Sequence, residues 1–488
     1  MTMEPSRPTA TGTHPFTGAT PPPGCPAHGL DSEQVHRLYG PVAEADPRAL
    51  YEALRKAHGT VAPVLLHGDL PAWLVLGYRE ILEVTRSPAR FTRDSRHWRM
   101  FHEGRVAADS PLRPMVQWQP NCIFVDGEEH RRLRSAVTDS LESFDRRGIR
   151  RYVIRYTDQL IDRFAASGSA DLISEFAEKL PMLVMTQLLG LPEQHGPILA
   201  DAALDLIKGS ATALRSNEFV VEMLRTLTMR KQSQPGHDLA SQLLGHEADL
   251  SEDEVVEHLR LVLIAANETT VNLIANTLRL VLTDRRFRAH LAGGHMTLPD
   301  AVEQVLWDEP PLSAIPGRWA TGDTVLGGRQ IRSGDLLMLG LEAGNADPEI
   351  RPDPSAPLHG NRGHLSFCSG PHECPGQEIG RAIADTGIDT LLARLPDLDL
   401  AVDKSELRSH AAWLSRRLDS LPVRFTPPRP AAAADTAAHF ASTAPQSLSV
   451  AAEVTARQAP PPPPASSRPR PGRFFSWWRR FTSRRQGG

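Results

Sequence analysis

The chain has 488 residues, a formal net charge of −4 and 40% hydrophobic residues, which is the composition of an ordinary globular protein. This charge balance gives no indication that the body of the chain binds nucleic acid. The four cysteines are too few and too scattered for a disulfide framework, and they fit a reducing cytoplasm. No run approaches the roughly 20 apolar residues of a membrane span, and we expect no secretory signal at the N-terminus.

Composition divides the chain into four parts. Residues 1–30 are rich in Pro, Thr and Gly, so we predict that they are disordered. Residues 31–429 are predicted to form one globular domain. An Ala- and Pro-rich linker is predicted over residues 430–472, and a basic and aromatic segment follows over residues 473–488.

Helical patterns dominate the predicted domain, with a minor sheet near both of its ends. Two short strands are predicted around the turn at Gly68-Asp69, and further strands over residues 324–339. Ser251 is a good N-cap, and the apolar periodicity after it predicts one long, buried helix that ends near Leu282. The other helices are predicted over residues 46–58, 128–140, 149–166, 170–190 and 300–307.

The sequence HLSFCSGPHECPGQEIGR over residues 364–381 carries the strongest chemical signal. Gly370 and Gly376 flank Cys374 and allow the backbone to approach a flat ligand, because they have no Cβ. A helix is predicted to begin just after Cys374, and its N-terminal dipole would favour the thiolate. The stretch therefore predicts one thiolate that is offered to a metal from a tight loop.

This spacing resembles the haem-binding loop of the cytochrome P-450 superfamily, Phe-Gly-x-Gly-x-His-x-Cys-x-Gly-x-x-Leu-Ala-Arg. Phe367, His372, Cys374 and Gly376 match that loop, whereas Cys368 stands in place of a Gly. Ile379 and Gly380 also depart from the pattern. The resemblance covers about 400 residues and implies the mainly α cytochrome P-450 fold, with haem b between the long central helix and the Cys-loop helix.

Two other interpretations of the loop are open. His364, Cys368, His372 and Cys374 are four potential zinc ligands, although structural zinc sites more often use two separated pairs. Alternatively, Cys374 is a buried structural cysteine, since a free thiol packs as a small hydrophobe. Neither interpretation explains why Phe and Gly residues frame the cysteine.

The predicted central helix contains Ala265-Ala266-Asn267-Glu268-Thr269-Thr270. The family has Ala-Gly-x-Asp/Glu-Thr-Thr here, and its acid and alcohol relay protons to dioxygen. The resemblance implies that Glu268 and Thr269 are catalytic. The structural alternative is a helix interior with a back-bonded Thr and a salt-bridged Glu.

The resemblance also implies which side chains bind the haem propionates. His130 and Arg134 lie one helical turn apart and share a face. Arg318 matches a further propionate-binding cation of the family, and His372 is the fourth candidate. A solvated basic helix face is the alternative for His130 and Arg134, and a charge at a strand edge is the alternative for Arg318.

The largest departure from the family lies in AVEQVLW, residues 301–307. The superfamily has Glu-x-x-Arg at the positions of Gln304 and Trp307, and this pair forms a buried ion network with a later Arg. Both charges are absent here, and a neutral pair avoids the cost of desolvating ions. Arg362 is one candidate for the later Arg. An actinobacterial subgroup with Glu-Gln-x-Leu-Trp, typically encoded beside a small GTPase and a membrane sensor kinase, resembles this chain.

The end of the chain interleaves Arg with Phe and Trp. This pattern suits an anionic lipid surface. It predicts peripheral contact with the inner face of the cell membrane through residues 473–485. A solvated, disordered tail is the alternative.

The sequence as a whole predicts a cytoplasmic haem-thiolate monooxygenase that inserts one oxygen atom from O2 into a small organic substrate. Its electrons are expected from a ferredoxin and a ferredoxin reductase, because the chain shows no flavin or iron–sulfur motif. The rival hypothesis is a non-catalytic or weakly catalytic haem-thiolate sensor or scaffold in a membrane-associated signalling complex. The GTPase and kinase would be its partners.

Overall fold

The computed structural model describes residues 35–427 except positions 111, 209–211, 285–286, 289–292, 294–295, 354–357, 359 and 412–413. The chain divides into two units, Met1–Pro428 and Arg429–Gly488, and the described residues belong to the first unit. The predicted segments 1–30, 430–472 and 473–488 lie outside the described residues.

Helices make up most of the first unit, and the longest is α12 (Glu252–Thr283). The other α-helices are α1 (Pro41–Ala45), α2 (Pro47–His58), α3 (Tyr78–Arg86), α4 (Arg99–His102), α5 (Arg113–Val116), α6 (Gly127–Glu142), α7 (Arg146–Phe164), α8 (Leu180–Leu189), α9 (Gly196–Lys208), α10 (Ala213–Ser233), α11 (Leu239–Leu244), α14 (Leu298–Asp308), α15 (Leu341–Asn345) and α16 (Gln377–Arg394). Short 3₁₀ turns join them, including η4 (Cys122–Phe124) and η8 (Gly370–His372).

The main sheet has six strands in the order β1-β2-β3-β9-β6-β4. Its strands are β1 (His36–Arg37), β2 (Val61–Leu66), β3 (Leu70–Val75), β4 (Phe91–Thr92), β6 (Ile315–Ala320) and β9 (Leu336–Leu339). Three small sheets contain the remaining strands, which are β5 (Ser169–Asp171), β7 (Thr324–Leu326), β8 (Arg329–Ile331), β10 (Asp399–Leu400), β11 (Ser409–Ala411), β12 (Arg416–Leu418) and β13 (Pro422–Arg424).

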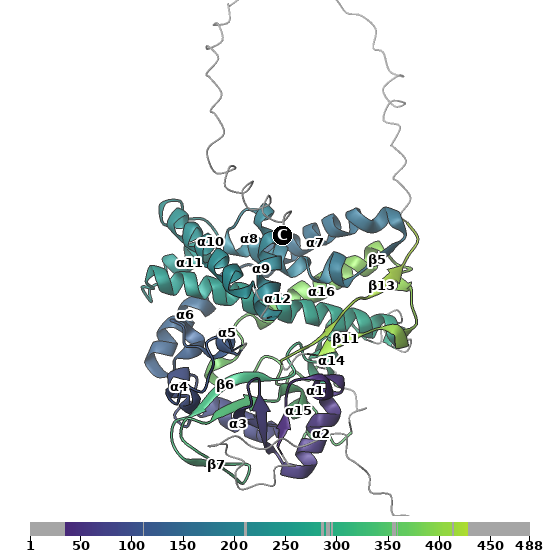
Figure 1. Cartoon of the computed structure of the whole chain (residues 1–488). Helices are drawn as coiled ribbons and strands as arrows, with labels where there is room; N and C mark the ends of the chain where they lie inside the picture. The colour runs from purple at the N-terminus through teal and green to yellow at the C-terminus, as the bar shows by residue number, and fades with distance from the viewer. Residues whose placement is uncertain are drawn as a thin grey trace, which may run out of the picture. The chain divides into compact units, whose positions relative to one another are not determined.

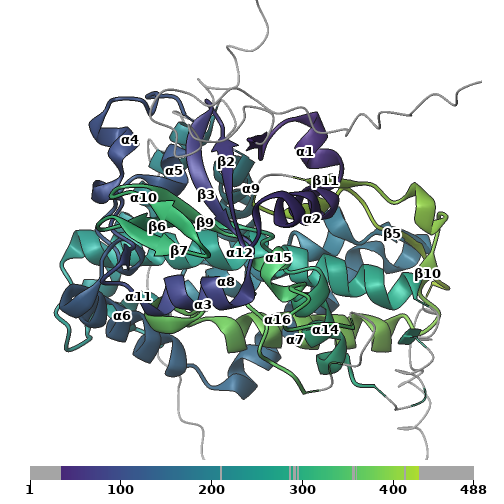
Figure 2. The same ribbon diagram turned by 90° about the horizontal axis from the view of Figure 1, so that it is seen from below.

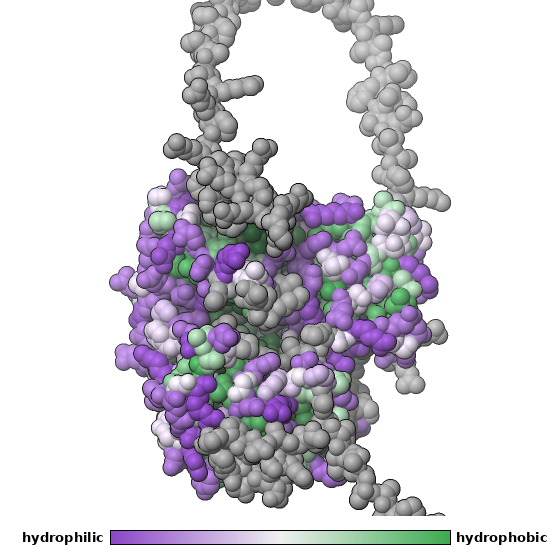
Figure 3. Space-filling view, in the orientation of Figure 1, coloured by the Kyte–Doolittle hydropathy of each residue, from purple (hydrophilic) through white to green (hydrophobic). Residues whose placement is uncertain are grey.

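The sheet and the helices form two parts with α12 between them. In Figure 1 the sheet lies with α1, α2, α3 and α15 below α12, and α7, α8 and α10 lie above it. Figure 2 views the same arrangement from the sheet side. Strands β2 and β3 are buried along their whole length, because one face packs with α2 and the other with α3. Figure 3 shows hydrophobic residues in a hollow between the two parts, on a surface that is otherwise mostly hydrophilic.

Local sequence explains the boundaries of α12. The Ser251 side chain accepts the backbone N–H of Glu254, whose carboxylate accepts the N–H of Ser251 in return, and this capping box starts the helix at the predicted residue. Contrary to the expectation from the sequence, this helix is long and apolar enough to cross a membrane, but 67% of its apolar window is buried inside the fold. It is therefore the central core helix that the apolar periodicity predicts.

One predicted helix is wrong. Residues 170–190 form strand β5, a π-helical turn (Ile173–Ala177) and then α8, instead of one continuous helix. Strand β5 forms because Ala170 pairs with Val423 of β13, which lies far away in the sequence. Such a pairing leaves no local periodicity to detect.

Candidate active site

Cys374 lies in a tight loop between η8 and the first turn of α16. Its backbone N–H donates to the Phe367 carbonyl at 2.9 Å, which fixes the cysteine over the start of the loop. Gly370 has φ +72°, and a Cβ there would lie 2.5 Å from the Thr85 carbonyl oxygen, so only glycine fits. Burial raises the pKa of the Cys374 thiol, and a hydrogen bond from the Gly376 backbone opposes this effect. A metal would remove the proton outright.

The central helix presents an uncovered face in the interior of the fold. Ala265 is exposed and Ala266 and Thr269 are half-buried, although most of the surrounding helix is buried. Thr269 donates to the Ala265 carbonyl at 2.6 Å. Helix α16 runs close by, since a Cβ on Gly380 would lie 4.0 Å from Thr270 Oγ1. The uncovered face and the helix that follows Cys374 are therefore neighbours.

Glu268 points to a different environment from Thr269. Its carboxylate accepts Arg417 Nη1 at 3.0 Å, and Arg417 also pairs with Glu178. A cavity of about 340 Å³ is lined by these three side chains together with Asn267 and Asp201. The back-bonded Thr and the salt-bridged Glu are the contacts that the structural alternative predicts. The cavity, however, also gives the Glu268 carboxylate a polar path along which protons could move away from the helix.

The four side chains that are candidates for binding the propionates meet beside the loop. His130 of α6 and His372 of η8 have ring centroids 4.0 Å apart, and His372 Nε2 lies 2.9 Å from Asp126 Oδ1. Arg318 of β6 is 3% exposed. The Arg134 guanidinium donates to the Glu373 carbonyl, which ties α6 directly to the loop.

A fifth basic side chain, Arg93, lies in the same cluster. This residue is not predicted from the sequence. It is buried, and it donates to the Ile123 carbonyl at 2.8 Å and the Gly317 carbonyl at 2.7 Å. Burial and the neighbouring Arg318 lower its pKa to about 9. No sequence signal marks this residue, because its partners lie 30 and 224 residues away.

Comparison with known proteins identifies the fold. No protein-family model matches the chain. The chain is 32% identical to cytochrome P450 107B1 of Saccharopolyspora erythraea over 364 residues, which are 73% of this chain and 89% of the relative. It is also 32% identical to the vitamin D(3) 25-hydroxylase of Pseudonocardia autotrophica over 404 residues, 81% of this chain and 97% of the relative. The solved structure of CYP154A1 from Streptomyces coelicolor matches with a TM-score of 0.71 at 28% identity and covers 78% of this chain and 98% of its own.

The chain belongs to the cytochrome P450 superfamily. The predicted fold class is confirmed, and the chain is an oxidoreductase of the haem-dependent P450 monooxygenase type. Its cofactor is haem b, as in the P450 relatives.

The charge cluster of this P450 fits the propionates of a haem. Among the described residues, His130 Nε2 and His372 Nδ1 are buried without a hydrogen-bond partner. Burial lowers the pKa of His130 to about 4 and that of His372 to about 3. Besides these imidazoles the cluster has the buried guanidiniums of Arg93 and Arg318 and one carboxylate, Asp126. With Arg134, the three guanidiniums outnumber the one carboxylate by two charges, which two propionates would balance.

The zinc interpretation of the P450 loop does not fit these contacts. His364 bonds to Glu303 and His372 to Asp126, so the two imidazoles are held by different partners. In the described part of the chain, no group of three or more His, Cys, Asp or Glu side chains could hold a metal ion.

A buried ion pair is present one residue before the position of the family's Glu. Positions 304 and 307 are neutral, but the adjacent Glu303 is buried and accepts Arg381 Nε at 2.6 Å. Arg362, the predicted later Arg, is 3.7 Å from Glu303 and 59% exposed, so Arg381 is the principal partner. The neutral pair spares only positions 304 and 307, because Glu303 of the same helix still carries a buried charge. Arg381 ends the loop motif, so its presence was visible in the sequence although its partner was not.

Proposed function

We propose that the Cys374 thiolate of this P450 would hold the haem iron and that the protein hydroxylates a small organic substrate. The observation that carries the proposal is the half-buried Cys374 loop beside the uncovered face of α12, next to a cluster of basic side chains with unpaired buried nitrogens. A thiolate-bound haem supplies dioxygen activation, because the sulfur donates electron density that favours O–O cleavage. In this proposal residues 31–429 form the complete haem domain.

The proposed binding residues divide into two groups. Phe367 and Gly376 shape the loop around Cys374, and Gly376 has room for a close approach because it lacks a Cβ. The propionates are held by donors from three separate segments, which are His130, Arg134, Arg318 and His372. Arg93 supports Arg318 by holding the Gly317 carbonyl beside it.

The proposed catalytic residues are Thr269 and Glu268. The Thr269 hydroxyl lies on the uncovered face and can turn from the Ala265 carbonyl to donate into the hollow. Glu268 can take a proton from the cavity on the other side of α12 when it leaves Arg417. Together the two side chains would connect solvent with the distal side of the haem.

The electron donor in this proposal is a ferredoxin that is served by a ferredoxin reductase. The first turns of α7 expose Arg146, Arg147, Arg150 and Arg151. Arg146 lies 3.2 Å from Glu378 in the first turn of α16, so this cationic surface adjoins the Cys374 loop. Such a surface suits an acidic redox protein that must approach the haem.

The names of the relatives indicate a class of substrate. The relatives include the vitamin D(3) 25-hydroxylase and a 2-hydroxy-5-methyl-1-naphthoate 7-hydroxylase of Streptomyces carzinostaticus. These names favour a small organic molecule with a large apolar part. They also favour an enzyme over the sensor or scaffold hypothesis.

The neutral Gln304 and Trp307 support membership of the actinobacterial subgroup that is encoded beside a small GTPase and a sensor kinase. In this proposal the protein is cytoplasmic, and residues 473–485 contact the inner membrane surface through Arg, Phe and Trp side chains. Residues 430–472 would be the linker between haem domain and membrane, and residues 1–30 a disordered extension.

Two measurements test the proposed function. We expect Cys374→Ser to abolish the thiolate-type absorption band of the reduced carbon monoxide complex, whereas the matched variant Cys368→Ser keeps it. A substrate screen by shifts of the haem Soret band, followed by turnover with a surrogate ferredoxin system, tests the monooxygenase. The ligand assignment fails if Cys368→Ser alone loses the band, and the enzyme assignment fails if bound ligands are never oxidised.

A further inference from the structure

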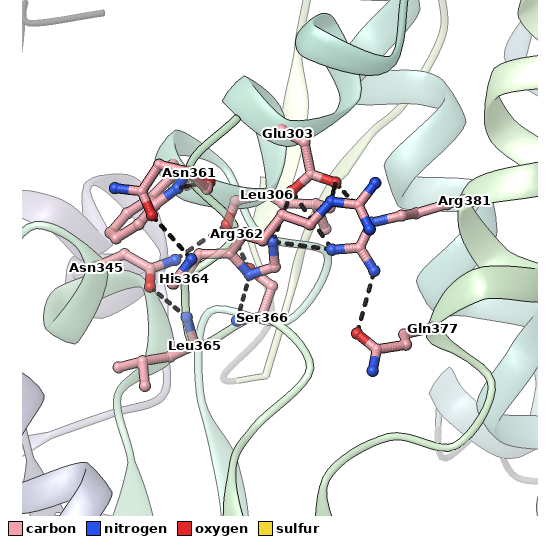
Figure 4. A network of polar contacts seen from close by, with 12 residues as sticks. Glu303, Leu306, Asn345, Asn361, Arg362, His364, Leu365, Ser366, Gln377 and Arg381 are labelled. Atoms are coloured by element: carbon pink, nitrogen blue, oxygen red, sulfur yellow. Dashed lines mark hydrogen bonds and ion pairs between the residues drawn. The ribbon is translucent and has the colours of Figure 1, made fainter. Parts of the chain in front are cut away.

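Glu303 of α14 joins the two ends of the Cys374 loop. Its carboxylate accepts Arg381 Nε at 2.6 Å and lies 3.1 Å from His364 Nε2. His364 stands at the start of the loop sequence and Arg381 at its end, so one buried carboxylate holds both (Figure 4). Burial disfavours the charged carboxylate, but the bonds to His364 and Arg381 outweigh this effect and lower the pKa of Glu303 to about 2.

The C-terminal part of α14 also holds the first part of the loop, through a backbone carbonyl. The Leu306 carbonyl accepts the Asn345 side chain at 3.0 Å and also the Ser366 hydroxyl. Asn345 in turn accepts the Leu365 backbone N–H at 2.7 Å. Figure 4 shows these side chains arranged around the segment from Asn361 to Ser366. The loop is thus anchored to α14 through the Leu306 carbonyl and through the Glu303 side chain.

Arg381 carries the connection from Glu303 to the cysteine. Its guanidinium lies over the Phe367 ring, 4.5 Å from the centroid. The Phe367 carbonyl accepts the Cys374 N–H at 2.9 Å. One continuous chain of contacts therefore runs from Glu303 through Arg381 and Phe367 to Cys374.

We propose that Glu303 is a positioning residue for Cys374, and that its charge helps to set the reduction potential of the haem iron through Arg381. The inference rests on the proposed function of Cys374 as the iron ligand. Because Gln304 and Trp307 are neutral, Glu303 is the buried carboxylate that compensates Arg381 next to the loop, and the other carboxylate near Arg381, Glu378 at 3.6 Å, is 42% exposed and screened by solvent. Without it, the positive guanidinium beside Phe367 would favour the reduced iron and raise the potential.

The test compares Glu303→Gln with Asp335→Asn in the full-length haem protein. Asp335 is a matched control, because it is also a buried carboxylate and pairs with Arg99 of α4 at 2.9 Å, just before β9. We expect Glu303→Gln to raise the reduction potential and to speed haem transfer to apomyoglobin roughly 10- to 100-fold, the usual range for residues that support a metal ligand. Asp335→Asn should lose stability but keep the potential and the transfer rate. Glu303→Asp, which retains the charge, should return the potential towards that of the wild type.

A second variant keeps the proposal testable if Glu303→Gln does not fold. Arg381→Lys retains the positive charge but loses the planar fork and its stacking on Phe367. We expect faster haem loss with a nearly unchanged potential. Equal potentials and transfer rates in Glu303→Gln and Asp335→Asn would overturn the inference, as would an Arg381→Lys variant that retains haem like the wild type. Failure of the proposed function itself would appear separately, as a wild-type protein without the thiolate-type band.

Discussion

Restoring the family's Glu-x-x-Arg pair should destabilise this P450. The indole of Trp307 is 2% exposed, and its Nε1–H donates to the Asn361 carbonyl at 2.8 Å. The Arg351 guanidinium lies 5.7 Å from the centroid of the same ring. In Trp307→Arg, a second guanidinium would therefore be placed beside Arg351, and the indole bond to the Asn361 carbonyl would be lost.

The second change, Gln304→Glu, would also be unfavourable because of the residue next to it. Gln304 donates to Asp308, which also pairs with Arg351 at 2.6 Å. Gln304→Glu would replace that donor with a second carboxylate and repel Asp308. Losing a buried indole costs about 3–5 kcal/mol. The double variant should therefore lose at least about 3 kcal/mol, a large part of the roughly 5–15 kcal/mol that typically stabilises a protein.

Thermal and urea unfolding, followed by haem absorbance, measure this loss for both single variants and for the double variant. Trp307→Phe is the matched control, because it keeps an aromatic ring and removes only the N–H donor. We expect it to lose much less stability than Trp307→Arg. A double variant as stable as the wild type would refute the reasoning. So would a double variant that is far more stable than the sum of its single changes, because the two introduced charges would then pair in the folded protein.

Three further predictions concern the proton path, acid stability and the tail. Thr269→Ala should retain normal haem content but divert electrons to peroxide or water, and unchanged coupling of NADH use to product would contradict its role. Because the pKa of Glu303 is about 2, below its ordinary 4.5, its pairing stabilises the fold fully above pH 4.5 and less as the pH falls through 2. The stability of Glu303→Gln should consequently depend less on pH in this window, as acid titration of unfolding can show, and an identical pH dependence would argue against the pairing. Full-length protein should sediment with anionic vesicles at low salt and be released at high salt, whereas a form that ends at Pro430 should stay in solution; equal sedimentation of the two forms would leave the tail without a membrane role.

Local sequence patterns were sufficient for the elements with strong signals of their own. The capping residue Ser251 and the apolar periodicity after it placed α12 correctly, and the Gly68-Asp69 turn placed β2 and β3. Both Gly68 and Asp69 have positive φ, as a tight hairpin turn requires. The loop around Cys374 was recognisable because the function proposed for it requires particular residues at fixed spacing. By contrast, β5 was missed because its partner strand lies far away in the sequence.

The tertiary structure decided how the side chains of the site are used. The sequence shows that Gln304 and Trp307 are neutral, but only the fold shows that Glu303 pairs with Arg381, 78 residues later. The burial of Arg93 beside Arg318 and the pairing of Glu268 with Arg417 likewise depend on segments that are brought together by packing. Helix periodicity specifies which face of a helix is buried, whereas the partner of a buried charge depends on which distant element covers that face. The sequence therefore determined the family of this protein and predicted its cysteine ligand, and the tertiary structure determined the network of charges around the loop.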